Sequence, residues 1–239
     1  MTPKTAVPTV RAGQPEARAA LSVELMIVTV IDGTLKVLLD QRAEHPFKGT
    51  WVLPGGVMRV SNTRQQGESL DACVERVLTE RTGLKTHACC IEQLHTFGRA
   101  GRDPRTRVVS VGWLIGVSPT QAAGMNADRS HWYSVSDEVP WMRLGFDHAE
   151  IIAVGETRIQ TSIERGTMAF ALAPKDFTVA DLRTVYETVL GKHQDARNFR
   201  RRFQRMTAQG LVECGPGKRH QGKSRPAQVW RFSGKHTNR

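Results

Sequence analysis

The segment that most constrains the fold of this chain runs from Glu68 to Gly83, downstream of a glycine loop, Leu53-Pro-Gly-Gly56. Its apolar residues recur at the spacing of an amphipathic helix, at Leu70, Val74, Val77 and Leu78. Gly83 is suited to end such a helix, because glycine adopts the left-handed conformation without strain. We therefore predict a helix over residues 69–82. Positions 77, 80 and 81 share one of its faces, which carries a valine, a glutamate and an arginine.

This segment resembles the Nudix box, the signature of hydrolases that cleave nucleoside diphosphates linked to another group. Six residues match the spacing of the box: Glu68, Arg76, Leu78, Glu80, Gly83 and Leu84. In active members the shared helix face carries three carboxylates, whose oxygens hold magnesium ions. Val77 and Arg81 occupy two of those three positions here. The resemblance implies a pocket that holds a nucleotide, with no hydrolase activity, no metal and no other cofactor.

The loop ahead of the helix is longer than the box pattern. Gly56 and Glu68 are 12 positions apart, whereas the pattern has 6. We expect the inserted residues, within 57–67, to lengthen a loop over the pocket. A neutral surface insertion is the alternative.

The remainder of the first 168 residues alternates strand and helix patterns. Runs of β-branched and aliphatic residues predict strands over 23–30, 35–39, 90–97, 108–117 and 131–134. A second long helix is expected over 147–164. The fold class is α+β: a Nudix-like α/β/α sandwich with a mixed sheet over residues 21–168, preceded by a mobile tail over residues 1–20.

Charge divides the chain into two unequal parts. Residues 176–239 contain 14 Lys and Arg against 5 Asp and Glu, a balance of +9 out of the net +11. A nearly neutral domain is thus followed by a strongly basic one, which indicates a polyanionic partner, above all nucleic acid.

Other classes of protein are disfavoured. No run of about 18 apolar residues occurs, so we expect no membrane span, and residues 1–20 lack the apolar core of a secretory signal. The four cysteines, at 73, 89, 90 and 214, form no C-x2-C pair, so neither a disulfide framework nor a zinc site is indicated. We expect a cytoplasmic protein with reduced cysteines.

The basic part has the layout of a winged helix-turn-helix, which we assign to residues 169–239. Thr178 and Asp181 form a capping-box pattern ahead of one helix, and Asp195 caps a second, on which Phe199 and Phe203 must face a core. A hairpin with a basic tip follows. We predict that DNA is contacted by the second helix through Arg197, Asn198, Arg200, Arg201 and Arg205, and by the wing through Lys218, Arg219, Lys223 and Arg225. A solvated basic face is the alternative.

The two parts in this order resemble the Nudix-related transcriptional regulators of NAD metabolism. The likeness extends over residues 23–232 and includes Pro46-Phe-x-Gly-x-Trp51, Arg102-Asp-Pro-Arg105 and Phe146-Asp-His-Ala-Glu150. It implies a homodimeric repressor of NAD synthesis or salvage genes that binds a palindromic operator and is released by ADP-ribose or a related nucleotide. The effector-binding residues implied by position are Arg42, Arg76, Glu80, Arg102, Asp103, Arg105 and Arg107.

Two other functions stay open on the sequence alone. The first is an active Nudix hydrolase of ADP-ribose-like substrates that uses Glu68, Glu75 and Glu80 and carries a nucleic-acid-binding appendage. The second is an RNA decapping or processing protein. Magnesium-dependent release of AMP from ADP-ribose distinguishes the former, and a preference for RNA over a palindromic duplex distinguishes the latter.

Overall fold

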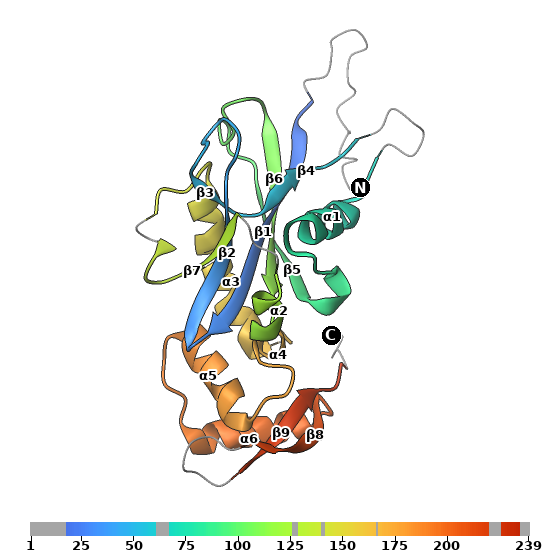
Figure 1. The fold of residues 1–239 in the computed structure, drawn as a ribbon, viewed down its shortest axis with the longest axis vertical. Helices are drawn as coiled ribbons and strands as arrows, with labels where there is room; N and C mark the ends of the chain where they lie inside the picture. Colours follow the sequence, from blue (N-terminus) through green and yellow to red (C-terminus); the bar gives the residue numbers. More distant parts are fainter. Residues whose placement is uncertain are drawn as a thin grey trace, which may run out of the picture.

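The N-terminal part of the protein is a three-layer sandwich of helices around one sheet (Figure 1). The computed structural model describes residues 18–60, 67–125, 129–139, 142–165, 167–219 and 226–234. Within them the sheet strands are β1 Ala20–Ile31, β2 Thr34–Gln41, β3 Trp51–Val52, β4 Gly55–Val57, β5 Cys90–Phe97, β6 Val108–Gly116 and β7 Ser130–Ser134. The tail predicted over residues 1–20 falls almost entirely outside the described residues, and β1 already begins at Ala20.

The sheet is mixed, as the sequence predicted. Its strands lie in the order β3-β2-β1-β6-β5, with β4 also paired to β1 and β7 to β2. The β1–β6 pair is parallel, and the other pairs are antiparallel. The long central strand β1 starts three residues before the predicted strand, because residues 20–22 pair with β6 through Val108, Val109 and Ser110.

The alternation of side chains along β1 explains why both faces of the sheet are covered. Val23, Leu25 and Ile27 pack with one helix layer, and Met26, Val28 and Val30 pack with the other. A strand buried on both faces must be apolar at consecutive positions, which is the pattern that the sequence shows from Leu25 to Val28.

The helices of the sandwich begin and end largely where capping residues place them. They are α1 Leu70–Thr82, α2 Pro119–Ala123 and α3 His148–Arg165, with a 3-10 turn, η1, at Thr86–Ala88. The Ser69 hydroxyl accepts a hydrogen bond from Ala72 N at 3.1 Å, and Gly83 ends α1 at φ 75°. The short α2 was not predicted. None of the helices in the described residues is both long and apolar enough to cross a membrane.

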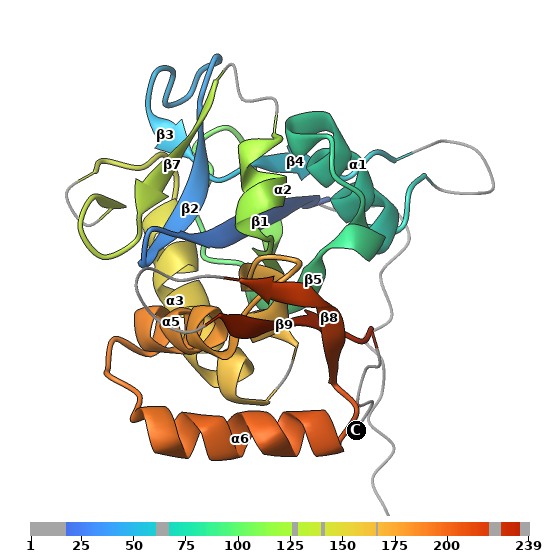
Figure 2. The same ribbon diagram turned by 60° about the horizontal axis from the view of Figure 1, so that its bottom comes forward.

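The C-terminal part is a compact helical unit with a hairpin beside it (Figure 2). It comprises α4 Met168–Leu172, α5 Val179–Leu190, α6 Ala196–Ala208 and the hairpin strands β8 Val212–Arg219 and β9 Ala227–Phe232. An isolated bridge between Phe177 and Trp230 ties the segment before α5 to the hairpin. Helix, turn, helix and hairpin follow in the order of a winged helix-turn-helix, as predicted.

The two parts share a continuous apolar core. One cluster joins sheet residues such as Met26 and Val37 to Ile159 and Ile163 of α3, and continues to Val185 of α5. At its edge the Thr188 hydroxyl donates to the Gly33 carbonyl in the β1–β2 turn at 3.1 Å. The basic domain is therefore packed against the sandwich, with α3 between the two.

Candidate functional site

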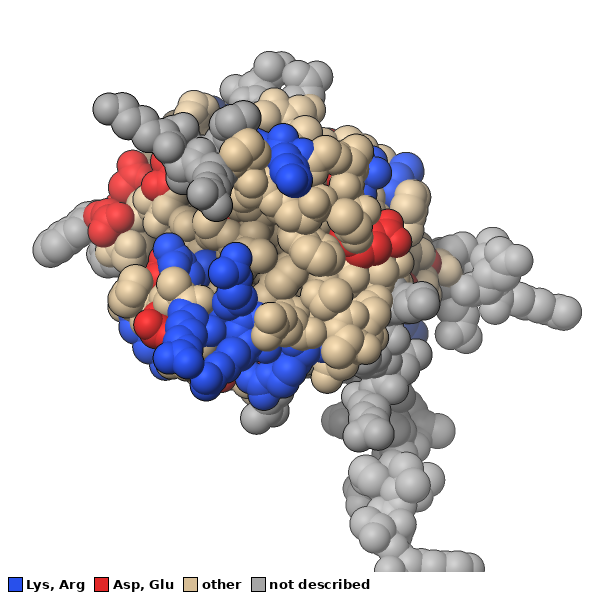
Figure 3. Space-filling model, turned by 90° about the horizontal axis from the view of Figure 1, so that it is seen from below, with Lys and Arg blue, Asp and Glu red and all other residues tan. Residues whose placement is uncertain are grey.

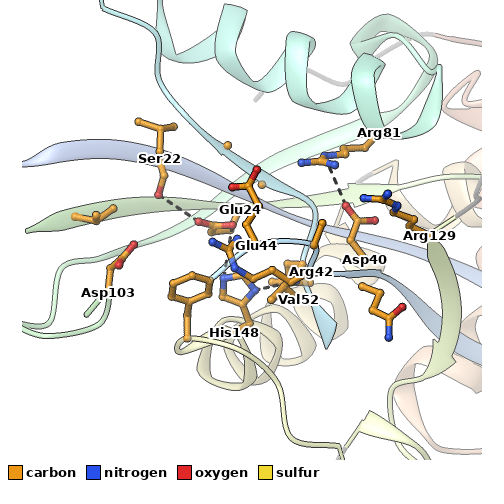
Figure 4. A pocket seen from close by; sticks show the side chains of 18 of the residues that line it. Ser22, Glu24, Asp40, Arg42, Glu44, Val52, Arg81, Asp103, Arg129 and His148 are labelled. Atoms are coloured by element: carbon orange, nitrogen blue, oxygen red, sulfur yellow. Dashed lines mark hydrogen bonds and ion pairs between the residues drawn. The ribbon is translucent and has the colours of Figure 1, made fainter. Parts of the chain in front are cut away.

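A polar cavity of about 540 Å³ opens in the sandwich between α1, β2 and the start of α3. Its lining side chains come from segments distant in sequence and converge on one space, as Figure 4 shows. The ionisable residues among them are Glu24, Asp40, Arg42, Glu44, Glu80, Arg81, Arg102, Asp103, Arg105, Arg129 and His148. A concave site with this many polar groups is suited to a charged small molecule rather than to an apolar one.

An ion pair between Arg102 and Asp147 lies buried at one side of this cavity. Two guanidinium nitrogens, Nε and Nη2, donate to the two carboxylate oxygens at 2.8 and 2.6 Å. The side chains are only 3% and 2% exposed. Arg102 Nη1 also donates to the Ser110 hydroxyl on β6. Arg102, which was predicted to contact the effector, lines the cavity with its guanidinium bonded to Asp147 and Ser110.

Glu24 forms part of the floor and is protonated more readily than an ordinary glutamate. Its carboxylate accepts from the Ser22 and Ser110 hydroxyls at 3.2 and 3.3 Å. Burial raises the pKa of Glu24 from 4.5 to about 7, against the lowering effects of Arg102 and of these two hydroxyls. Gly55 is required beside it, because a Cβ there would lie 1.9 Å from Glu24 Oε2.

His148, the first residue of α3, is held neutral next to Glu24. Its Nδ1 accepts a hydrogen bond from Leu53 N at 2.8 Å, so the proton lies on Nε2, 3.6 Å from Glu24 Oε2. Burial lowers the pKa of His148 from 6.5 to about 3. The contact is thus between a neutral imidazole and a carboxyl group. Sequence reasoning missed both residues; a glutamate within an apolar strand was the available signal.

Two arginines approach one aromatic ring at the mouth of the cavity. The guanidinium carbons of Arg42 and Arg105 lie 4.9 and 5.8 Å from the ring centre of Phe146. Arg42 Nε donates to the Pro46 carbonyl at 2.6 Å, and Arg105 pairs with Asp103 at 2.7 Å. These contacts hold both cations next to the cavity, where Arg42, Asp103 and Arg105, predicted to bind the effector, are among the lining residues.

Arg76 lies on α1 but is not among the residues that line the cavity. Its Nη2 pairs with Glu68 at 2.6 Å and also donates to the Val57 carbonyl at 3.0 Å. The hydrogen bonds from Arg76 lower the pKa of Glu68 to about 2. The i, i+4 contact with Glu80 is longer, at 3.4 Å. Arg76 therefore fastens the inserted loop to α1; residues 61–66 of that loop fall outside the described residues.

The positions that depart from the Nudix box differ in what they contact. Val77 is 1% exposed and belongs to the core beneath the Gly56 backbone, whereas Arg81 lines the cavity and reaches Asp40 on β2 at 3.6 Å. Glu80 is contacted by Arg59 and Arg76 at 3.2 and 3.4 Å. Within the described ranges there is no group of three or more His, Cys, Asp or Glu arranged to hold a metal ion.

Five of the seven residues predicted for the effector line the cavity: Arg42, Glu80, Arg102, Asp103 and Arg105. Arg76 and Arg107 do not. Arg107 Nη1 donates to the Arg99 carbonyl at 3.1 Å on the outer side of the loop. The cavity also contains Arg81, which the box pattern placed on this face of the helix, and Asp40 and Arg129, which the sequence did not assign to it.

The second candidate site is the outer face of α6. Phe199, Phe203 and Met206 are buried against α5 and the hairpin, as predicted. The opposite side exposes Arg197, Asn198, Arg200, Arg201 and Arg205. Seen from below, on the side of α6, lysine and arginine side chains gather into one patch (Figure 3). A helix of this length fits the major groove of DNA, where these arginines would face the bases and the phosphates.

The wing is described only in part. Lys218 on β8 is exposed. Arg219 Nη1 pairs with Asp181 at 2.9 Å and its Nη2 donates to the Asp176 carbonyl, so this arginine joins the wing to the capping box of α5. Lys223 and Arg225, both predicted to contact DNA, fall outside the described residues.

Comparisons with known proteins agree with this arrangement. The model of the NUDIX domain matches residues 21–153, and that of the NrtR DNA-binding winged helix domain matches residues 169–232. The ADPR responsive transcriptional repressor NtrR of Acinetobacter baylyi is 33% identical, with 89% of this chain and 82% of the repressor covered. An ADP-ribose pyrophosphatase of Methanocaldococcus jannaschii is 32% identical over 52% of this chain and 67% of its own length.

A solved structure extends the likeness over both domains. The crystal structure of Shewanella oneidensis NrtR complexed with a 27mer DNA has a TM-score of 0.76 and 33% identity, with 89% of this chain and 93% of that chain covered. With both domains matched in the same order, this chain belongs to the NrtR-type family of Nudix-related transcriptional regulators.

Proposed function

We propose that this protein is a transcriptional repressor of NAD synthesis or salvage genes that releases its operator when ADP-ribose or a related nucleotide enters the Nudix cavity. The observation that carries the proposal is that one continuous apolar core joins two sites. One site is the exposed basic helix α6, and the other is the polar cavity, which has the size of a nucleotide. The relative from Acinetobacter baylyi, named as an ADPR responsive repressor, supports it.

The DNA-binding role rests on α6 and the hairpin. Four exposed arginines on one helix face can contact phosphates and guanine edges, while Lys218 on the wing adds a backbone contact. The relative from Shewanella oneidensis was crystallised with DNA, which supports the same role here. A homodimer would present two such helices to the half-sites of a palindrome, about 34–36 Å apart.

The effector role rests on the charge and shape of the cavity. Arg42, Arg81 and Arg105 supply cations for phosphate oxygens, and the Phe146 ring beside two of them offers an apolar surface. Acidic side chains such as Asp103 and Glu44 can accept hydrogen bonds from ribose hydroxyls. A nucleoside diphosphate joined to a second ribose, as in ADP-ribose, suits this combination.

Helix α3 offers a direct mechanical connection between the two sites. It starts at His148 in the cavity wall and, with 18 residues, extends about 27 Å toward the basic domain. Near its end the Glu164 carbonyl accepts from Arg202 Nη2 of α6 at 3.0 Å. Arg202 also lies over the ring of Tyr186 on α5, 4.4 Å from its centre. A shift of α3 on nucleotide binding would therefore change the position of α6, the helix proposed to contact DNA.

We further propose that the cavity binds its nucleotide without hydrolysing it. The support is the residue set on α1: Val77 is buried, Arg81 is paired with Asp40, and Glu80 is contacted by two guanidinium groups. These residues offer no cluster of free carboxylates for the magnesium ions of a Nudix hydrolase.

An active hydrolase is the second candidate, favoured by the similarity to an ADP-ribose pyrophosphatase. It would use Glu68, Glu75 and Glu80. Glu68 accepts hydrogen bonds from Arg76 and from Arg59 N, and Glu75 accepts from Thr86 N at 2.8 Å on the far side of the helix. Glu68 and Glu80 are both contacted by Arg59 and Arg76. Because all three carboxylates already have partners and Glu75 is bonded elsewhere, they form no free cluster for a metal ion, which favours the repressor.

The experiment that tests the proposed function is footprinting of the full-length protein on the DNA upstream of its own gene and neighbouring genes. We expect protection of a palindrome that is lost when ADP-ribose is added. Binding of single-stranded or double-stranded RNA in preference to any duplex DNA would instead identify an RNA-processing protein.

A further inference from the structure

The side of the cavity formed by α1 carries a cation in place of a carboxylate. Arg81 is half-exposed and extends from α1 across the cavity toward Asp40 of β2, with 3.6 Å between its Nε and the Asp40 carboxylate (Figure 4). Asp40 is itself 7% exposed and also accepts a hydrogen bond from the Ser130 hydroxyl at 2.5 Å. Arg81 is thereby directed toward the carboxylate in the cavity, while about half of its side chain stays exposed.

A second guanidinium lies at the same end of the cavity. Arg129 precedes β7, and its carbonyl accepts from Gln41 N at 2.9 Å, next to Asp40. The register of β2 and β7 sets Asp40 opposite Ser130. Arg129 is exposed and lines the cavity together with Arg81. Asp40 is therefore paired with Arg81, and Figure 4 shows the Arg129 side chain at the same end of the cavity, so two guanidinium groups lie near this one buried carboxylate.

The balance of charge on this wall is the opposite of what a magnesium site requires. The one carboxylate left on the shared face of α1, Glu80, is already contacted by two guanidinium groups. A divalent cation placed beside it would face Arg81 without the carboxylates that normally offset its charge. A phosphate group at the same place would be attracted by Arg81 and Arg129 together.

We propose that Arg81 and Arg129 form a diphosphate subsite that binds a nucleoside diphosphate without a divalent cation, with the Arg81 guanidinium in the electrostatic role that a metal has in the hydrolases. This inference rests on the proposed function and names how the same cavity binds its effector. A guanidinium matches phosphate oxygens with parallel N–H donors and stays charged at all relevant pH values.

The subsite also explains how a sensor keeps its effector intact. Guanidinium groups neutralise phosphate charge, but they do not lower the pKa of a bound water as metals do. Arg81 would thus attract the diphosphate as a metal ion does in the hydrolases, but it would not activate a water molecule for hydrolysis. Its substitution by a carboxylate should weaken nucleotide binding and make the remaining binding depend on magnesium.

The test is calorimetric titration of ADP-ribose, ADP and AMP into the full-length protein, in buffer with EDTA and in buffer with magnesium. Three variants accompany the wild type: Arg81→Gln, Arg81→Glu and Arg99→Glu. Arg99 is an exposed arginine of the same domain that does not line the cavity, so it controls for a change in net charge. Thermal melting of each variant reports whether it folds.

For the wild type we expect equal affinity for ADP-ribose in the two buffers, within about twofold, and weaker binding of AMP. Arg81→Gln should weaken ADP-ribose binding in EDTA by about tenfold or more, the loss of one charge-assisted hydrogen bond. Arg81→Glu should weaken it further, with part of the affinity restored by magnesium. Arg99→Glu should behave as the wild type.

The inference is overturned if wild-type ADP-ribose binding disappears in EDTA and returns with magnesium, an outcome that leaves the sensor function intact. It is equally overturned if Arg81→Gln, folded as judged by its melting curve, binds as the wild type does. Binding of ADP in EDTA with no binding of ADP-ribose would contradict the proposed effector yet support the diphosphate subsite.

Discussion

Arg102 and Asp147 form a bidentate ion pair, 2.6 and 2.8 Å long and almost wholly buried, between the loop preceding β6 and the residue preceding α3. The pair fixes the start of α3 at the cavity wall, one residue before His148. At the other end of α3, the Glu164 carbonyl accepts a hydrogen bond from Arg202 of α6. The Arg102–Asp147 pair therefore holds the end of α3 that lies at the cavity, while the opposite end contacts the basic helix.

We predict that Arg102→Met destabilises the protein by about 3–5 kcal/mol, because it leaves the Asp147 carboxylate buried without its partner. The measurement is urea unfolding at neutral pH. Arg99→Met is the matched control: the Arg99–Glu150 pair is exposed and 3.8 Å long, so its loss should cost less than about 1 kcal/mol. Equal effects of the two substitutions would show that burial of the Arg102 pair contributes nothing.

The second prediction concerns pH. The folded-state pKa of Glu24 is raised from 4.5 to about 7, so the folded protein binds a proton that the unfolded chain has released. Stability from this group is complete below pH 4.5 and is lost as the pH rises through 7. The loss at higher pH is roughly 3 kcal/mol.

Glu24→Gln, which keeps the shape but cannot ionise, should remove this part of the pH dependence. The measurement is the free energy of unfolding of both proteins from pH 5 to about 8.5. As the pH rises, the stability of the variant relative to that of the wild type should increase. A constant difference across that range would mean that Glu24 does not titrate there.

The third prediction concerns the basic face of α6. Arg200→Ala should cost roughly 1–3 kcal/mol on the operator and relax base preference at one position. Lys218→Ala should weaken binding to every DNA sequence alike and reduce the salt slope by about 0.9. Anisotropy titrations at several salt concentrations measure both, with Arg99→Ala as the control. If alanine at Arg197, Arg200 and Arg201 together left operator affinity unchanged, α6 would not be the DNA-contacting helix.

The fourth prediction is that ADP-ribose is not hydrolysed above background with magnesium or manganese. Release of AMP, followed by chromatography, is the measurement. The double substitution Val77→Glu and Arg81→Glu restores the carboxylates of the box and is the informative comparison, although Val77 is buried and its replacement should lower stability. Wild-type turnover on the enzyme scale of ~1–1000 per second would establish a hydrolase.

The helices could be predicted from the sequence because their signals are local. Apolar spacing and Gly83 placed α1 to within one residue of its observed bounds, and Asp195 caps α6 as predicted. The positions of Phe199 and Phe203 on the buried side of α6 followed from the same spacing. These features depend on neighbours within one helical turn, so a single sequence contains them.

The cavity could be predicted only in part, because its side chains meet across the fold. Glu24 and His148 come from strands and helices far apart in the chain, and no local pattern pairs them. Arg76 shows the same dependence: it was predicted to bind the effector, and in the structure it pairs with Glu68 at the end of the inserted loop at 2.6 Å, closer than its helical neighbour Glu80 at 3.4 Å. Which charged group faces the cavity depends on such tertiary contacts.

The proposed function requires that a bound nucleotide weakens operator binding by the same protein, and that a bound operator weakens nucleotide binding. A nucleotide can weaken DNA binding only if it binds the DNA-competent arrangement less tightly than another. A typical coupling of ~1–3 kcal/mol corresponds to a loss of ~5–150-fold in operator affinity, and linkage requires the operator to weaken nucleotide binding by the same factor.

The most direct measurement is a titration of ADP-ribose into the protein–operator complex, with operator affinity followed by anisotropy and NAD, AMP and ribose 5-phosphate as comparators. The account predicts that saturating ADP-ribose lowers operator affinity within the range above, and that the operator lowers ADP-ribose affinity equally. ADP-ribose that binds the free protein tightly yet leaves operator affinity unchanged at saturation would contradict it.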